Sequence, residues 1–305
     1  MPLLTLAHST AYTYRDAVSF GEHRIMVRPR ESYDQHLIEA RLEIEPRPVE
    51  LRWLQDVFGN SVAIATFNKR AKRLSIFSHL RVQHDPAKLQ EVHIEDYARL
   101  YPFTYSSEDM PDLLRSIERQ HLDPAREIDG WARRFINLAG QTDTLAMLSN
   151  MTATIKRDFT YVSRHEKGTQ TPLETLTKRQ GTCRDFAALM IEAARALGLA
   201  ARFVSGYVYS PTSREVHVGG GNTHAWVRVY LPGSGWVEFD PTNGIVGNHG
   251  LIRVAVARDI YQAVPISGTW SGYPGSFLDI EVAVNITVDS EGSANFANTT
   301  TALEN

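Results

Sequence analysis

Cys183, His224 and Asp240 occur in this chain order, and they are the residue types of a nucleophile, a general base and its orienting group. A thiol becomes a strong nucleophile beside a base, and a carboxylate holds that base in one orientation. Each residue alone also has an ordinary structural explanation, as a buried apolar filler, a strand histidine or a turn former before proline. Their occurrence together, each in a suitable local context, favours acyl-transfer chemistry.

The segment from Cys183 is predicted to be a helix. Apolar residues recur at offsets 3, 6, 7, 10 and 14, the period of one helical face, and Gly198 is a typical helix end: Phe186, Leu189, Met190, Ala193 and Leu197. The unpaired N–H groups and the positive dipole end of a helix N-terminus both stabilise a thiolate. Buried cysteines are nevertheless common as inert filler, so the helix by itself leaves both interpretations open.

His224 begins the predicted strand THAWVRVYL, and Asp240 ends the next strand, GWVEFDP. A plain four-residue loop over 232–235 would pair Leu231 with Trp236. Because side chains alternate between the faces of a sheet, that register would place His224 and Asp240 on opposite faces. A plain hairpin is therefore incompatible with a triad.

Pairing Tyr230 with Trp236 instead sets Asp240 opposite Trp226 and diagonal to His224 on the same face. Diagonal neighbours lie about 7–8 Å apart, within reach of a carboxylate–imidazole hydrogen bond. We therefore predict this shifted register, which needs an irregular turn. Two glycines permit one: Gly233 and Gly235.

The remaining pattern indicates an α+β protein. An alternating segment predicts a half-buried strand with Ile38, Ala40, Leu42 and Ile44 on one face, and a second segment does so with Leu74, Ile76, Leu80 and Val82. A helical period follows, with Asp123 expected as an N-cap, Pro124 in the first turn and Gly140 past the end. We expect a β-rich N-terminal domain over 1–85, a helical region plus catalytic core over 86–270, and a closing strand with a mobile tail over 271–305.

Composition excludes several classes of protein. The 305 residues carry a net charge of -3 with mixed signs, which argues against a nucleic-acid partner. A single cysteine excludes an intramolecular disulfide framework, and no run of apolar residues suits a membrane span or a signal sequence. We expect a soluble, cytoplasmic protein without a membrane partner. No metal-binding motif is present, so neither a metal nor another cofactor is expected.

Several longer segments resemble the transglutaminase-like core of bacterial cysteine acyltransferases and proteases: GTCRDFAALM, ALGLAARFVSGYV and THAWVRVYLPGSGWVEFDPTNG. The segments YTYRDAV, VRPRES, DVFGNSV and RDIYQAVPISG resemble the N-terminal domain and closing segment of the same family. The resemblance implies a papain-like core, in which the nucleophile helix packs on an antiparallel sheet, and a β-rich N-terminal domain. It implies that the final strand, around 280–288, returns to that domain.

The resemblance assigns Cys183 as the nucleophile, His224 as general base and then acid, and Asp240 as orienter. Relatives often have glutamine after the nucleophile, whereas this chain has Arg184. The guanidinium either lowers the pKa of the thiol or points to solvent, and the sequence leaves both open. Animal transglutaminases depend on calcium, but no corresponding site is visible here.

Three further residues are candidates for the site. Tyr161 is a candidate oxyanion donor beside the backbone N–H of Cys183, its alternative being a buried strand aromatic. Trp226 and Trp236 are candidates for the walls of a substrate groove, although such residues are commonly core. Gly219–Gly221 predict either a gating loop or a plain connection.

The expected function is therefore thiol acyl transfer on a carboxamide or peptide bond through a thioester. A cysteine protease or amidase, or a transglutaminase, would act on a peptide or protein substrate in this way. The alternative is a non-catalytic binding or scaffold module that retains the fold. The intact set of Cys183, His224 and Asp240 argues against the scaffold.

Overall fold

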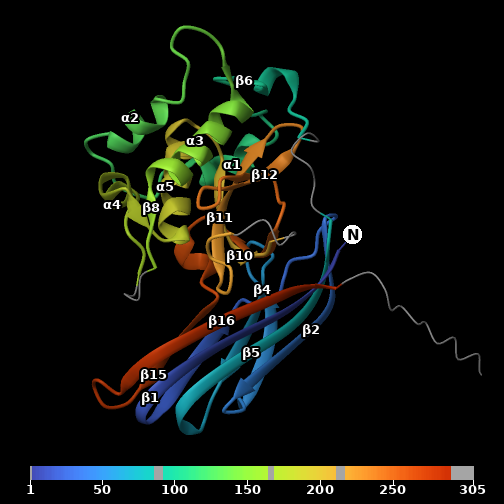
Figure 1. Ribbon diagram of the computed structural model, residues 1–305, viewed down its shortest axis with the longest axis vertical. Helices are drawn as coiled ribbons and strands as arrows, with labels where there is room; N and C mark the ends of the chain where they lie inside the picture. Colours follow the sequence, from blue (N-terminus) through green and yellow to red (C-terminus); the bar gives the residue numbers. More distant parts are fainter. Residues whose placement is uncertain (1, 86–91, 164–167, 211–216, 290–305) are drawn as a thin grey trace, which may run out of the picture.

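The structure is a computed structural model that describes residues 2–85, 92–163, 168–210 and 217–289. A long, curved β-sheet forms one part, and helices packed around a second sheet form the other (Figure 1). This arrangement confirms the α+β class. The expected tail over 290–305 lies outside the described residues.

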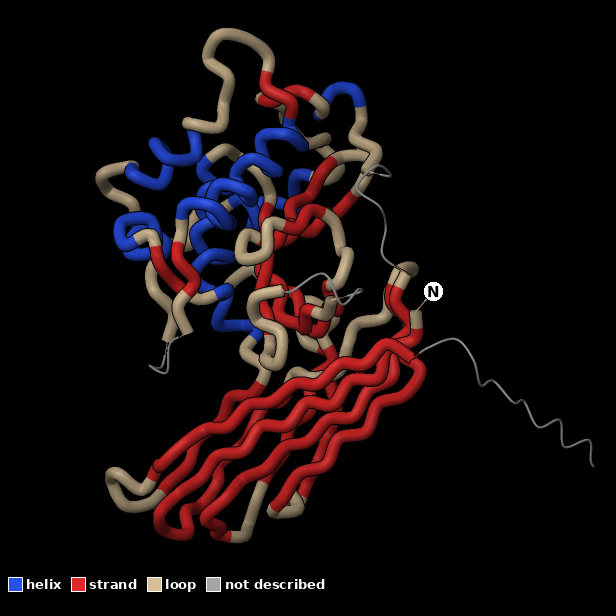
Figure 2. Tube along the Cα trace, in the orientation of Figure 1, coloured by secondary structure: helices blue, strands red, loops and turns tan. Residues whose placement is uncertain are grey.

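The N-terminal sheet is built on one very long strand, β1 (Leu3–Ile25). Its first half pairs with β5 and β16, and its second half pairs with β4 and β15. The strands of this sheet lie side by side and roughly aligned in Figure 2. Besides β1, they are β2 (Gln35–Glu45), β3 (Glu50–Gln55), β4 (Ser61–Thr66), β5 (Arg70–His84), β15 (Ile266–Ser271) and β16 (Phe277–Asp289).

The predicted return of the closing strand is observed, because β16 pairs antiparallel with β1 from Leu3 to Tyr14. The four apolar residues expected on one face of β5 are all buried. In β2 the expected alternation is wrong at Ile38, which is 54% exposed. The register shifts between Leu37 and Glu39, so Leu37 takes the core-facing position and Ile38 is turned outward.

The second sheet has the order β13–β12–β11–β10–β14. Its strands are β10 (Ala201–Val208), β11 (His224–Leu231), β12 (Gly235–Asp240), β13 (Ile245–Val246) and β14 (Leu251–Ala257). Around it lie α1 (Met110–Ile117), α2 (Glu127–Arg133), α3 (Thr144–Asp158), α4 (Pro172–Lys178) and α5 (Cys183–Ala196). Two separate two-stranded sheets pair β6 (Leu100–Tyr101) with β7 (Thr142–Asp143) and β8 (Thr160–Tyr161) with β9 (Gln180–Gly181). Short 3-10 helices lie at Asp96–Ala98 and Ile260–Ala263.

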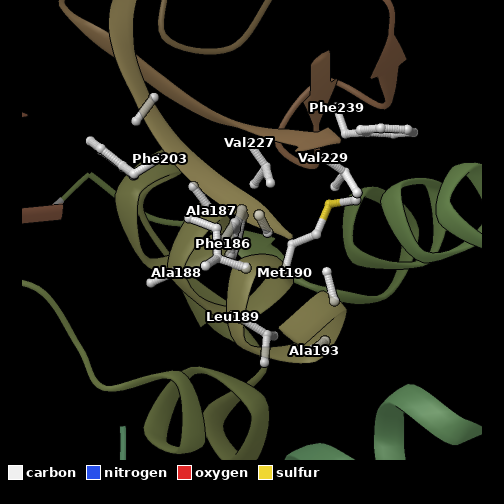
Figure 3. Packing of buried hydrophobic residues seen from close by; sticks show 14 of the residues in the cluster. Phe186, Ala187, Ala188, Leu189, Met190, Ala193, Phe203, Val227, Val229 and Phe239 are labelled. Carbon is white, nitrogen blue, oxygen red and sulfur yellow. The ribbon is translucent and has the colours of Figure 1, made fainter. Parts of the chain in front are cut away.

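The helix predicted from Cys183 is α5, and it forms the centre of the larger core. Met190 reaches toward Val229 of β11 (Figure 3), and Phe186, Ala193 and Val227 belong to the same buried cluster. Gly198 follows the helix with φ +77°, a left-handed conformation that favours glycine. Burial of this apolar face, rather than helix propensity, holds the N-terminus of α5 against the end of the sheet.

The helix expected after Asp123 begins later than predicted, at Glu127, and ends at Arg133 rather than near Gly140. The capping role of Asp123 is nevertheless retained. Its carboxylate accepts hydrogen bonds from the backbone N–H groups of Glu127 at 2.9 Å and Ile128 at 3.0 Å. The side chain reaches the helix across an intervening turn, a geometry that the capping pattern alone does not specify.

Asn60 joins the N-terminal sheet to the core. It is fully buried, and its amide exchanges two hydrogen bonds with the backbone of Val256 in β14, at 2.8 and 2.9 Å. Arg30 donates to the same Asn60 oxygen at 2.7 Å. A second buried junction lies nearby, where the Arg253 guanidinium pairs with the carboxylates of Asp34 and Glu238.

Among the described residues, no helix has both the length and the apolar character needed to cross a bilayer.

We predict that Asn60→Ala lowers the free energy of unfolding by about 3 kcal/mol, because the buried backbone N–H and C=O of Val256 lose their hydrogen bonds to the Asn60 amide. Urea denaturation measures the change. Asn68→Ala, in an exposed turn between β4 and β5, is the matched control and is expected to change stability by less than about 0.5 kcal/mol. Equal effects of the two substitutions would contradict the bridging role of Asn60.

Candidate active site

The start of α5 is anchored by the buried carboxylate of Asp185. Its oxygens accept from the backbone N–H of Thr182 at 2.8 Å and from the Thr182 hydroxyl at 2.9 Å. They also accept from the backbone N–H of Gln170 at 2.7 Å. Cys183 therefore sits in the first turn of a helix whose N-terminus is tied to a neighbouring segment. The Thr-x-x-Asp spacing is a capping signal that the sequence analysis overlooked.

The predicted register of β11 and β12 is confirmed, since Tyr230 pairs with Trp236 and Leu231 with Gly235. The turn is one residue shorter than a plain four-residue loop. Gly233 and Gly235 take φ values of +90° and +69°, which a tight turn of this shape requires.

The shifted register brings His224 and Asp240 into contact. The Nε2 atom of His224 and the Oδ2 atom of Asp240 are 2.7 Å apart, and neither side chain is exposed to solvent. Hydrogen bonds between charged groups at this distance are among the stronger ones in proteins. The imidazole is therefore held through Nε2, which leaves Nδ1 as the nitrogen available to a reacting group.

Asp240 is also bound by the turn that follows it. Its Oδ1 atom accepts from the backbone N–H of Thr242 at 2.9 Å, and the Asn243 side-chain amide donates to Oδ2 at 2.8 Å. The side-chain amide of Asn243 also accepts from the backbone N–H of Val218 at 2.8 Å and donates to the Val218 carbonyl at 3.1 Å. Asn243 thus links the carboxylate to the segment before His224. The sequence analysis missed this positioning residue, whose signal is a polar residue directly after Asp-Pro-Thr.

Electrostatics favour a charged histidine and an ionised thiol. Burial, the largest influence, would lower the pKa of His224, but the charge of Asp240 and the hydrogen bond to it raise that pKa above its ordinary value. Burial would likewise raise the pKa of the Cys183 thiol, yet interaction with His224 and the charge of Arg184 lower it. Burial would raise the pKa of Asp240, but the charge of His224 and the hydrogen bond to it lower that pKa below its ordinary value. Asp240 therefore remains ionised.

The Nδ1 atom of His224 is buried and makes no hydrogen bond of regular geometry among the described residues. The Cys183 thiol interacts with the His224 side chain, and since Nε2 faces Asp240, Nδ1 is the nitrogen left for the thiol. Thiol–imidazole contacts of this kind are often long before a substrate binds. The structure therefore brings Cys183, His224 and Asp240 together at one end of the sheet.

Arg184 is partly buried, with its guanidinium 5.5 Å from the centre of the Phe203 ring. Its charge is one of the influences that lower the pKa of Cys183. Of the two alternatives left open by the sequence, the structure supports the cation that acts on the thiol. A cation–aromatic contact holds the charge in place without neutralising it.

Tyr161 lies beside the site. Its short strand, β8, runs parallel to β9, and Tyr161 pairs with Gly181, two residues before the thiol. Burial raises the pKa of the Tyr161 hydroxyl, and the charge of Cys183 raises it further, so the phenol stays protonated as a donor. The side chain is 36% exposed, which excludes the alternative of a buried core aromatic.

The two tryptophans do not form a groove at Cys183. Trp226 is fully buried, so its assignment as a groove wall is wrong for this conformation. Its ring lies nearly parallel to that of His224, 6.0 Å between centres, and shields the histidine from solvent on one side. Trp236 lies at the opposite end of β12 from Asp240, with the Arg202 guanidinium 4.0 Å from its ring centre.

A glycine covers the free side of the imidazole. A methyl group added at Gly219 would lie 2.7 Å from Nδ1 of His224, and the backbone there has φ +92°. The next segment is tied to the N-terminal domain, because the backbone N–H of Val284 in β16 donates to the carbonyl of Gly221 at 2.9 Å. Only a residue without a side chain fits between this loop and the histidine.

Residues 130–241 match the family model of the Transglutaminase-like superfamily, and residues 4–83 match that of the Bacterial transglutaminase-like N-terminal region. The chain belongs to the transglutaminase-like superfamily. Cys183, His224 and Asp240 all lie within the matched core. This is a thiol-based catalytic family, which agrees with the chemistry available at the end of α5.

The superfamily relatives include an uncharacterised protein of Mycobacterium tuberculosis, 28% identical over 310 residues that cover 95% of this chain and 93% of that protein. A protein-glutamine gamma-glutamyltransferase of Pseudomonas aeruginosa is 37% identical over 67 residues, which cover 21% of this chain and 10% of that protein. The crystal structure of a candidate cysteine protease from Cytophaga hutchinsonii shares the fold, with a TM-score of 0.68 and 21% identity over 96% of this chain and 93% of that one.

The described part of the transglutaminase-like chain contains no group of three His, Cys, Asp or Glu side chains arranged to hold a metal.

Alkylation of Cys183 with iodoacetamide is predicted to remain fast below the usual thiol pKa of about 8.5. A thiolate forms above the thiol pKa, so the lowered pKa moves the midpoint of the rate profile to lower pH. His224→Ala should move the midpoint above the ordinary value, because burial, the largest influence on the thiol pKa, then exceeds the opposing charge of Arg184. The single cysteine makes intact-mass measurement unambiguous, and urea-unfolded protein provides the reference.

Gly219→Ala is predicted to displace His224 and to slow alkylation at pH 6 by roughly tenfold or more, since one unit of pKa corresponds to a factor of ten in thiolate. Gly221→Ala is the matched control. Gly221 has a similar φ of +84°, but nothing lies within 4 Å of an added methyl group. If the two variants slowed alkylation equally, backbone strain rather than contact with the imidazole would explain the effect.

Proposed function

We propose that the chain is a thiol acyl-transfer enzyme, with Cys183 as nucleophile, His224 as general base and acid, and Asp240 as orienter. The observation that carries the proposal is the fully buried His224–Asp240 pair, 2.7 Å long, beside a thiol of lowered pKa. A buried charged pair is costly to desolvate, so it is weak evidence for stability. It is the arrangement that a thiolate nucleophile requires.

In the acylation step, the Cys183 sulfur attacks the carbonyl carbon of a carboxamide or peptide bond. In this proposal the backbone N–H of Cys183 and the Tyr161 hydroxyl donate to the developing oxyanion. His224 transfers its proton from Nδ1 to the departing nitrogen as the C–N bond breaks. Ammonia or an amine leaves, and a thioester on Cys183 remains.

In the second step, His224 takes a proton from water or from a primary amine, which then attacks the thioester. The C–S bond breaks and the thiol is regenerated. Water as the acceptor makes the enzyme a protease or amidase, whereas an amine makes it a transglutaminase. The short similarity to a protein-glutamine gamma-glutamyltransferase supports glutamine as the first acyl donor to test.

The substrate proposed is a peptide or protein, and no nucleic acid or membrane partner enters the reaction. The cytoplasmic location stays a prediction. A scaffold that retains the fold is the competing function. The lowered pKa of Cys183 favours the enzyme, because an inert buried thiol would have a raised pKa.

The test is ammonia release from glutamine-containing peptides, with and without a fluorescent primary amine, by wild type and Cys183→Ala. We expect the variant to lose activity by roughly a thousandfold or more. Incorporation of the amine would identify a transglutaminase, and peptide cleavage without incorporation would identify a protease. Undiminished activity of Cys183→Ala would overturn the proposal.

A further inference from the structure

A groove lined by uncharged side chains in the N-terminal sheet reaches Thr223, the residue before His224. Two adjoining cavities, about 300 and 150 Å³, share Tyr12, Ile266 and Ile280. We call them together the aromatic groove. Its main walls are Tyr12, Tyr14, His23, Trp270, Phe277 and Ile280.

The inner end of the aromatic groove is formed by Thr223, with Thr10 and Val282 beside it. Thr223 directly precedes His224, and consecutive Cα atoms are about 3.8 Å apart. The groove therefore ends one residue before His224 in the chain, although it is built mainly from the other domain.

The walls suit an apolar side chain. The rings of Trp270 and Phe277 meet the Tyr14 ring edge to face, with centres 5.2 and 5.9 Å apart. Burial lowers the pKa of His8 to about 4, and that of His23 also falls, so both histidines are neutral near pH 7. The side chains that line the groove carry no carboxylate, lysine or arginine.

The strand beside the groove offers main-chain hydrogen bonds. β16 pairs with β1 on one side, and no described strand pairs with its other edge. The backbone N–H of Val284 leaves that edge to reach Gly221. Because backbone groups alternate in direction along a strand, the N–H and C=O of Val282 point off the same edge. An edge of this kind binds extended peptides by strand addition.

We propose that the aromatic groove and the open edge of β16 bind the acyl-donor polypeptide in extended form. One large aromatic or aliphatic side chain of that polypeptide occupies the groove, a few residues from the residue that reacts with Cys183. The inference rests on the proposed function, since it assigns the substrate site of the same thiol. It makes the N-terminal domain part of substrate recognition rather than a separate module.

The experiment uses tetrapeptide chloromethyl ketones in which a single Phe is moved through an otherwise all-Ala sequence, with the all-Ala compound as reference. The rate of Cys183 modification is followed by intact mass. At least one Phe compound is expected to react roughly tenfold faster than the reference, the scale expected for burying a large apolar side chain. Equal rates for all compounds would overturn the proposal that a substrate side chain binds in the aromatic groove.

Ile280→Lys places a charge in the groove at a position that is already 44% exposed, and it should abolish the preference for Phe. Val288→Lys is the matched control on the same strand, 45% exposed and outside the groove, and it should retain the preference. If the preference for Phe survives Ile280→Lys, the side chain does not bind in the aromatic groove and the proposal is also overturned. Iodoacetamide separates the two proposals: a thiol of ordinary pKa would refute the catalytic function, whereas a reactive thiol without side-chain preference would refute only the groove.

Discussion

A carboxylate without solvent contact must be satisfied by its neighbours, and Asp240 imposes this requirement on the whole site. Its two oxygens accept from His224, from the amide of Asn243 and from the backbone of Thr242. Satisfying it fixes the orientation of the imidazole, the shape of the turn after β12 and the path of the segment before β11. The charge that Asp240 retains raises the pKa of His224, and the charged histidine in turn lowers that of the thiol. The reactivity of Cys183 thus depends on a residue that no reacting group needs to touch.

Cys183 and His224 are held by different balances of interaction. α5 buries an apolar face against β10, β11 and β12 (Figure 3), and the Asp185 carboxylate ties its first turn to Thr182 and Gln170. His224 is placed mainly by polar contacts at the end of the same sheet. Apolar packing tolerates side chains of similar volume, whereas hydrogen-bond geometry does not. The combination gives a rigid helix start and an imidazole held in one orientation.

The N-terminal domain is joined to the core by buried polar residues rather than by a linker alone. Asn60 and Arg253 each satisfy groups from both parts, and Val284 of β16 holds the loop that covers His224. The chain also crosses between the parts twice, because β15 and β16 return to β1 after the core is complete. The sheet therefore contributes to the surroundings of His224 directly, through the contact of Val284 with Gly221.

Local pattern was sufficient for much of the architecture. The period of α5, the alternation of β5 and the Cys183, His224 and Asp240 set were all readable from single segments, because helix period, strand period and residue chemistry are local properties. The register of β11 and β12 was also predictable, since the pairing of a plain four-residue loop places His224 and Asp240 on opposite faces and a shift by one residue corrects this. The bulge at Ile38 and the late start of α2 were not predictable, because each is decided by packing against a distant element.

What the sequence by itself determined is the candidate set of Cys183, His224 and Asp240, the helix that presents the thiol and the α+β class. Only the tertiary structure decided that Trp226 is core, that Arg184 acts on the thiol, and that Asn243 and Gly219 surround the histidine. It also decided that the opening beside Thr223 is an aromatic groove contributed largely by β1, β15 and β16. The physical reason is that burial and charge interaction depend on three-dimensional distance, which neither the spacing nor the type of these residues encodes.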